Sequence, residues 1–311
     1  MGSCVATLKV EFEEDRRDFD LDEFDGRWVE YFGSSRIIKD RRAYLGLRFT
    51  LFASVLAIFV WSITVDALAG DLRCWLIYLT HQGLLIELCY LGLAAATTAA
   101  SFYFTNVDGT PGPPVKMPWY CKAAWVLQGV ALPGSFLIFV LYWGLVYDGS
   151  MHAISPFTHG VNFAIMVADQ ILSNQPMYLL HAAFFMVYCV AYLAWTVVHY
   201  AAGLKDCDNN RYIYGALDWS NPSSAGRIAG AVVVVAAPLV NVAFWSLFFR
   251  RAKGPSRKVA PAGEAAPAEC KDPAYTGREA SDASGYFGDA LRKTDPDDSR
   301  RRVTARNPEP A

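Results

Sequence analysis

Residues 45–68 read LGLRFTLFASVLAIFVWSITVDAL, an almost uninterrupted apolar stretch. A helix needs about 20 such residues to cross a hydrocarbon core about 30 Å thick. Four further stretches of this kind are present, at 74–104, 123–147, 177–203 and 225–249. A weaker one at 154–173 keeps the chain alternating between the two sides of a membrane. We therefore predict an all-α polytopic integral membrane protein whose core is a six-helix transmembrane bundle.

Charged residues gather at the two ends of the chain. Of its 28 Lys and Arg residues, 8 lie in 1–42 and 13 lie in 250–311, which leaves 7 between them. A water-soluble domain as long as 43–249 could not cover its surface with so few charges. The sequence thus predicts an N-terminal tail at 1–42, a six-span domain at 43–249 and a disordered C-terminal tail at 250–311.

The positions of the basic residues predict the orientation. One cluster (Arg36, Lys39, Arg41 and Arg42) precedes the first span, and another follows the last span at 250–258. Such clusters stay in the cytoplasm, so both termini are expected there. The membrane itself is left open between the plasma membrane and the endoplasmic reticulum. Membrane lipids are the expected partners, and a net charge of -2 with no basic groove argues against nucleic acid.

The seven cysteines are scattered and form no CxxC pair. This spacing predicts buried thiols that act as small apolar residues rather than a disulfide framework or a zinc site. No motif indicates a metal ion or a cofactor.

Polar residues interrupt two of the predicted spans at helical spacing. Thr80 and Glu87 are seven residues apart in one span, and His159, Asn162 and Asp169 follow one face of another. Because lipid cannot satisfy such groups, both faces should point into the bundle.

Counting residues from the outer boundary places Thr80 and His159 at matching depth, about 8–9 Å below it. A hydroxyl beside an imidazole is a minimal nucleophile and general base. Asp169 lies deeper, where we predict that it pairs with His181. The same polar residues could instead only hold the helices together.

Short motifs give the chain a family resemblance. They are the run WLIYLTHQG at 75–83, His159-Gly160 followed by Asn162, His181 after Pro176, and YIYGALDW at 212–219. Together they resemble the rolling stone proteins, multi-span proteins linked to myoblast fusion, over about 45–249.

The Leu-Thr pair at Thr80 and the His-Gly pair at His159 also look like the androgen-induced protein family. Its members are membrane threonine hydrolases that cleave fatty acid esters of hydroxy fatty acids. This resemblance implies that Thr80 is a nucleophile and that His159 is its base.

Two functions follow from these observations. The first is an intramembrane hydrolase of lipid esters, in which Thr80 attacks, His159 takes its proton, and Asn162 or His199 donates to the oxyanion. The second is a non-enzymatic role in adhesion, fusion or scaffolding, in which the polar residues only pack the helices. A transporter fits less well, because paired broken spans are absent from the sequence.

Overall fold

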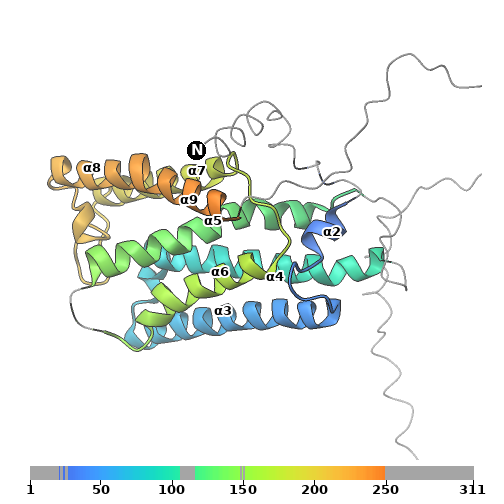
Figure 1. The fold of residues 1–311 in the computed structure, drawn as a ribbon. Helices are drawn as coiled ribbons and strands as arrows, with labels where there is room; N and C mark the ends of the chain where they lie inside the picture. Colours follow the sequence, from blue (N-terminus) through green and yellow to red (C-terminus); the bar gives the residue numbers. More distant parts are fainter. Residues whose placement is uncertain are drawn as a thin grey trace, which may run out of the picture. The chain divides into compact units, whose positions relative to one another are not determined.

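A computed structural model describes residues 21, 24, 27–105, 116–147, 149 and 151–248, and within them the regular elements are all helices (Figure 1). The α-helices run side by side as a bundle, joined or extended by 3₁₀ turns (η1, η2, η5) and π-helical turns (η3, η4, η6). Their bounds are α2 Trp28–Phe32, α3 Arg41–Ala69, η1 Leu72–Ile77, α4 Leu79–Ser101, η2 Phe102–Phe104, α5 Trp119–Leu141, η3 Tyr142–Val146, η4 Phe157–Val161, α6 Asn162–Leu172, α7 Ala182–Ala201, η5 Gly215–Leu217, α8 Pro222–Gly230, η6 Ala231–Ala236 and α9 Ala237–Phe248.

Five of the described helical segments are long and apolar enough to cross a membrane. They correspond to the five plain stretches in the sequence: Arg41–Ala69, Leu79–Phe104, Trp119–Val146, Ala182–Ala201 and Pro222–Phe248. Local sequence explains where the first one begins and ends. The Asp40 side chain accepts hydrogen bonds from the N–H groups of Arg42 and Ala43, and Gly70 ends the helix in the left-handed conformation, with φ 83°.

The predicted sixth span is a shorter helix. Within 154–173, η4 and α6 extend from Phe157 to Leu172 and together are about 24 Å long at the usual rise per residue. The chain then continues as a non-helical segment as far as α7. Five long helices and one short helix therefore stand where six spans are expected. The polar side chains of this segment explain the difference, because they need protein partners instead of lipid.

Residues 34–36, which precede α3, hydrogen-bond the backbone at the end of α6. The Leu172 carbonyl at the end of α6 accepts hydrogen bonds from the Ser35 hydroxyl (2.6 Å) and the Arg36 N–H (3.2 Å). The Asn174 N–H donates to the Ser34 carbonyl (3.3 Å). These bonds satisfy backbone groups that a membrane could not.

The predicted N-terminal tail is therefore partly folded. Helix α2 packs against α4 and contributes to an aromatic cluster of buried side chains: Phe24, Trp28, Tyr31, Phe32, Met117, Cys121, Trp125 and Tyr178. Phe24 and residues 27–40 pack with the bundle. Residues 1–20 and the predicted disordered tail at 250–311 lie outside the described residues.

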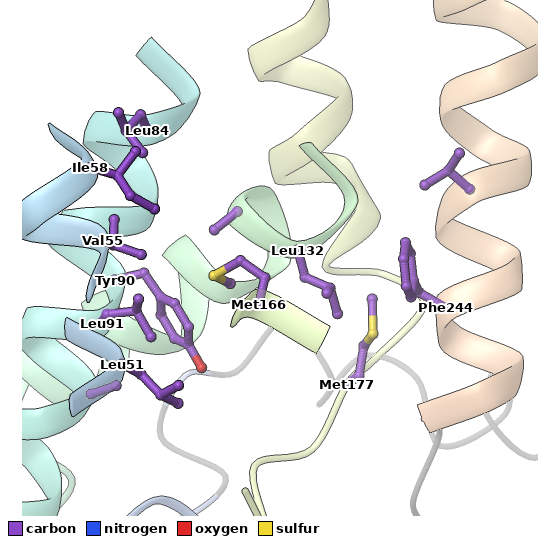
Figure 2. Close-up of a cluster of buried hydrophobic side chains, with 13 residues drawn as sticks. Leu51, Val55, Ile58, Leu84, Tyr90, Leu91, Leu132, Met166, Met177 and Phe244 are labelled. Atoms are coloured by element: carbon purple, nitrogen blue, oxygen red, sulfur yellow. The ribbon is translucent and has the colours of Figure 1, made fainter. Parts of the chain in front are cut away.

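The apolar core shows how the short helix is held (Figure 2). Met166 of α6 is 1% exposed and belongs to one cluster with Val55 of α3, Leu91 of α4, Leu132 of α5 and Phe244 of α9. Helix α6 thus packs against the bundle through the face that carries Met166, and its buried polar side chains face protein there.

A disulfide corrects the prediction for the cysteines. Cys74 in η1 is bonded to Cys207 in the loop after α7, across 133 residues of sequence. Spacing could not reveal this pair, because only the tertiary structure brings the two loops together. Among the other described cysteines, Cys121 is buried as expected, whereas Cys89 is exposed.

Candidate functional site

The polar residues of α4 and of the η4–α6 segment meet in three successive pairs. Both helices run from the end that carries η1 toward the end that carries α2, so their residues stay in step. Ten residues separate the first and third members on each helix, which is about 15 Å of rise. The three pairs are Thr80 with His159, Glu87 with Asn162, and Tyr90 with Asp169.

The first pair brings a hydroxyl to an imidazole. Thr80 Oγ1 lies 3.5 Å from His159 Nδ1, which allows the hydroxyl to donate to that nitrogen. The separation is slightly longer than a typical hydrogen bond, as is common for catalytic pairs without substrate. The geometry is that of a nucleophile beside its base, and whether the pair is catalytic remains a prediction.

Thr80 lies in the first turn of α4. Tyr78 is extended and Leu79 begins the helix, so the N–H groups around Thr80 have no partner within the helix. The N–H of Leu79 donates instead to the Tyr214 hydroxyl (3.0 Å). Thr80 therefore lies at the positive end of the α4 dipole, which would stabilise negative charge there.

Two features orient His159. It belongs to η4, a π-helical turn, which is a distortion often found at functional sites. Its ring stacks on Tyr142 of η3, with ring centroids 3.5 Å apart and planes inclined by 5°. The stack fixes the plane of the imidazole and leaves Nδ1 directed to Thr80.

Thr80 and His159 line a cavity of about 430 Å³. Apolar side chains from α5, α7 and η6 form most of its wall, including Ile138, Phe185 and Val233. Tyr214 of the loop after α7 is also in the wall, and its hydroxyl bonds the Leu79 N–H next to Thr80. An apolar chamber with a few convergent polar groups is typical of a site for an apolar small molecule.

The second pair lies outside this cavity. Asn162 donates to Glu87 Oε1 (3.2 Å), and both residues are fully buried. Asn162 does not line the cavity, so it is not placed to act as the predicted oxyanion donor there. His199, the other candidate, hydrogen-bonds the Arg211 carbonyl (3.3 Å) and is not in the wall of the cavity.

The third pair corrects the predicted partner of Asp169. Its carboxylate forms a buried salt bridge with Arg48 of α3 and accepts a hydrogen bond from the Tyr90 hydroxyl (2.6 Å). The predicted partner, His181, packs against the Trp125 ring instead, with ring centroids 4.4 Å apart. The reason is that α7 begins only after His181, beside Gly129 of α5 rather than beside α6.

Sequence reasoning missed two residues of this arrangement. Arg48 was overlooked in an apolar span, although it follows Tyr44 by four residues and thus shares its face. The Arg48 Nε–H donates to the Tyr44 hydroxyl (2.8 Å). Tyr214 gave no local signal beyond its place in the motif at 212–219. Among the described residues, no cluster of His, Cys, Asp or Glu could hold a metal ion.

The fold and the site define a multi-span helical membrane protein with a Thr–His pair beside an apolar cavity. A family model described as "Protein rolling stone" matches residues 11–256. The chain therefore belongs to the rolling stone family. It is 25% identical over 218 residues to Protein rolling stone of Drosophila melanogaster, which covers 66% of this chain and 75% of the relative. No solved structure matches the chain. These matches do not extend to the androgen-induced proteins.

Proposed function

We propose that this rolling stone family protein is an intramembrane hydrolase of lipid esters, with Thr80 as nucleophile and His159 as general base. The observation that carries the proposal is the contact between Thr80 Oγ1 and His159 Nδ1 in the wall of a mostly apolar cavity. A purely structural pair would need no cavity beside it.

The reaction would proceed in two steps. Thr80 Oγ1 attacks the ester carbonyl carbon while its proton passes to His159. The bond to the alcohol oxygen then breaks, and the alcohol leaves with the proton from His159. Water next attacks the acyl-threonine, again losing a proton to His159, and the carboxylic acid is released as Thr80 regains its proton. Residues of this chain supply each proton transfer, so no metal ion or cofactor is required.

The wall of the cavity supports a lipid substrate. Its apolar side chains suit an acyl chain, and an ester group would lie beside the Thr80–His159 pair in its wall. The burial of such a chain contributes roughly 0.8 kcal/mol per methylene group. Long-chain esters should therefore bind more tightly than short-chain ones.

The proposal includes a topology of six crossings with both termini in the cytoplasm. The short helix formed by η4 and α6 would count as one crossing, completed by the segment that leads to α7. The disulfide supports this orientation, because Cys74 and Cys207 lie in the loops at the opposite end of the bundle from the basic residues around Arg41. Stable disulfides form in oxidising compartments, outside the cytoplasm. The plasma membrane and the endoplasmic reticulum both meet this requirement.

A non-enzymatic role in adhesion, fusion or scaffolding is the second candidate. The observation that favours it is the burial of the Glu87–Asn162 and Arg48–Asp169 pairs, which lie away from the cavity and hold helices together. In this case the Thr80–His159 contact would be a third structural pair.

A substitution at Thr80 separates the two candidates. Thr80→Val removes the hydroxyl at nearly constant shape, so it should abolish hydrolysis of a long-chain para-nitrophenyl ester and labelling by a fluorophosphonate probe. The matched control is Thr98→Val in the same helix, whose hydroxyl bonds only the Ala94 carbonyl (3.0 Å). The control should retain both activities. Equal labelling of wild type and Thr80→Val would overturn the hydrolase and leave the non-enzymatic role.

A further inference from the structure

The loop between α7 and α8 brings a second hydroxyl close to the Thr80–His159 pair. Within this loop, Tyr214 reaches the first turn of α4, where its hydroxyl accepts a hydrogen bond from the Leu79 N–H (3.0 Å). Leu79 directly precedes Thr80, so this hydroxyl lies beside the turn that carries the nucleophile. Tyr214 also lines the cavity, so its hydroxyl lies where the nucleophile and the substrate would meet.

The Tyr214 hydroxyl has a proton to donate. It accepts from Leu79, and a phenol has only one proton of its own. The neighbouring Tyr192 hydroxyl donates to the Ile77 carbonyl (3.0 Å), so its proton is committed. The Tyr214 proton is therefore available to an acceptor in the cavity, beside the first turn of α4. When Oγ1 bonds to a carbonyl carbon, the new oxyanion lies next to that oxygen and becomes the stronger acceptor.

The surroundings keep this hydroxyl protonated. Burial raises the pKa of Tyr214, and the hydrogen bond from the Leu79 backbone opposes that rise only in part. The phenol is therefore neutral at physiological pH and acts as a donor instead of as a competing anion.

The loop holds Tyr214 in place through several contacts. Cys207 ties the loop to η1 through the disulfide with Cys74. Asp206 accepts hydrogen bonds from the backbone and side chain of Asn210, which closes the turn before Tyr214. The Tyr214 ring meets the Tyr78 ring edge-on, with centroids 5.9 Å apart. A donor held this firmly requires little rearrangement when negative charge develops on the carbonyl oxygen of the ester. Such preorganisation is the condition for efficient stabilisation of an oxyanion.

We propose that Tyr214 is a catalytic residue whose hydroxyl donates a hydrogen bond to the carbonyl oxygen of the ester as Thr80 attacks. The proposal rests on the proposed hydrolase function. Tyr214 keeps its proton throughout: the oxygen gains negative charge as the Thr80 bond forms, and loses it as the bond to the alcohol breaks. Tyr214 thus takes the role that the sequence assigned to Asn162 or His199.

The test is Tyr214→Phe, assayed with the long-chain para-nitrophenyl ester beside wild type and Thr80→Val. Loss of one oxyanion donor should lower kcat about 10²–10³-fold with little change in KM. Fluorophosphonate labelling should become slower, yet reach completion, because Thr80 and His159 remain. The control is Tyr200→Phe, at the end of α7, which removes a hydroxyl that does not line the cavity and should leave kcat unchanged.

A fluorinated tyrosine at position 214 separates chemistry from folding. It keeps the shape of the ring and the acceptor for Leu79, but its hydroxyl is a stronger donor, so it should restore kcat to at least the wild-type value. A kcat for Tyr214→Phe within about threefold of wild type, or a rise in KM alone, would overturn the role of Tyr214. In that case, labelling that depends on Thr80 would show that the hydrolase stands. Labelling of wild type that does not depend on Thr80 would overturn both proposals.

Discussion

At the scale of single residues, the same kinds of polar side chain serve different purposes at different depths. Thr80 and His159 line a cavity, whereas Asp169 and Arg48 are sealed within the bundle. The Asp169 carboxylate has two partners, the Arg48 guanidinium and the Tyr90 hydroxyl, and both charges are almost completely buried. A buried pair of this kind costs desolvation energy, but removal of one partner costs more because it leaves a lone charge.

We expect Asp169→Leu to lower the free energy of unfolding by about 3–5 kcal/mol, since it leaves the Arg48 guanidinium without its carboxylate. Arg48→Met together with Asp169→Leu should recover most of that loss. Denaturant titrations in detergent would give the coupling energy between the two positions. A double-mutant cycle that combines Asp169→Leu with His181→Phe should give a coupling energy near zero. A larger coupling to His181 than to Arg48 would contradict the observed pairing.

At the scale of elements, the short helix α6 depends on the N-terminal segment beside it. Residues that precede α3 satisfy the Leu172 carbonyl, while α2 covers the aromatic cluster around Trp125. The close approach of α2 to α4 requires a glycine at position 33. A Cβ atom there would lie 2.4 Å from the Ser101 Cβ and 2.8 Å from the Val29 carbonyl oxygen.

Gly33→Ala should therefore displace α2 and destabilise the protein by about 1–3 kcal/mol, because neither the Val29 backbone nor the Ser101 Cβ can move aside easily. The matched control is Gly46→Ala in α3, where an added Cβ meets nothing within 4 Å. The control should be neutral or slightly stabilising, because alanine favours a helix. Thermal unfolding would rank the variants, and hydrogen exchange should increase in α2 for Gly33→Ala. Equal exchange in both variants would show that the contact with Ser101 does not hold α2.

At the scale of the whole molecule, the two ends of the bundle differ in chemistry. One end carries Arg41, which donates to the Ser101 hydroxyl (2.8 Å), together with the folded N-terminal segment. The other end carries the disulfide and the loop after α7, which lines the cavity. This asymmetry fits a membrane between a reducing and an oxidising compartment. Basic residues stay on the cytoplasmic, reducing side, and disulfides form on the oxidising side.

We expect the disulfide end to face away from the cytoplasm. In sealed vesicles with the cytoplasmic face outward, protease should remove the 250–311 segment directly. A membrane-impermeant maleimide should label Cys74 and Cys207 only after reduction and permeabilisation. The Cys74→Ser/Cys207→Ser variant is the control that identifies the labelled sites. Labelling of these two cysteines in reduced vesicles that are still sealed would contradict the proposed orientation.

The sequence by itself determined the helical class, the five long apolar spans and the faces that carry polar residues. These properties follow from composition and from the 3.6-residue period of a helix, which are local. The sequence also predicted that Thr80 and His159 lie at the same depth, because residues equally far from the start of two parallel helices stay level with each other.

Only the tertiary structure decided which polar groups are partners and where the cavity lies. The pairing of Asp169 with Arg48, the Cys74–Cys207 bond and the approach of Tyr214 to Leu79 each join residues separated by more than 100 positions. The short α6 and the folded N-terminal segment likewise depend on each other. Such contacts depend on how the helices and loops pack in three dimensions, and helical period and hydropathy carry no information about that packing.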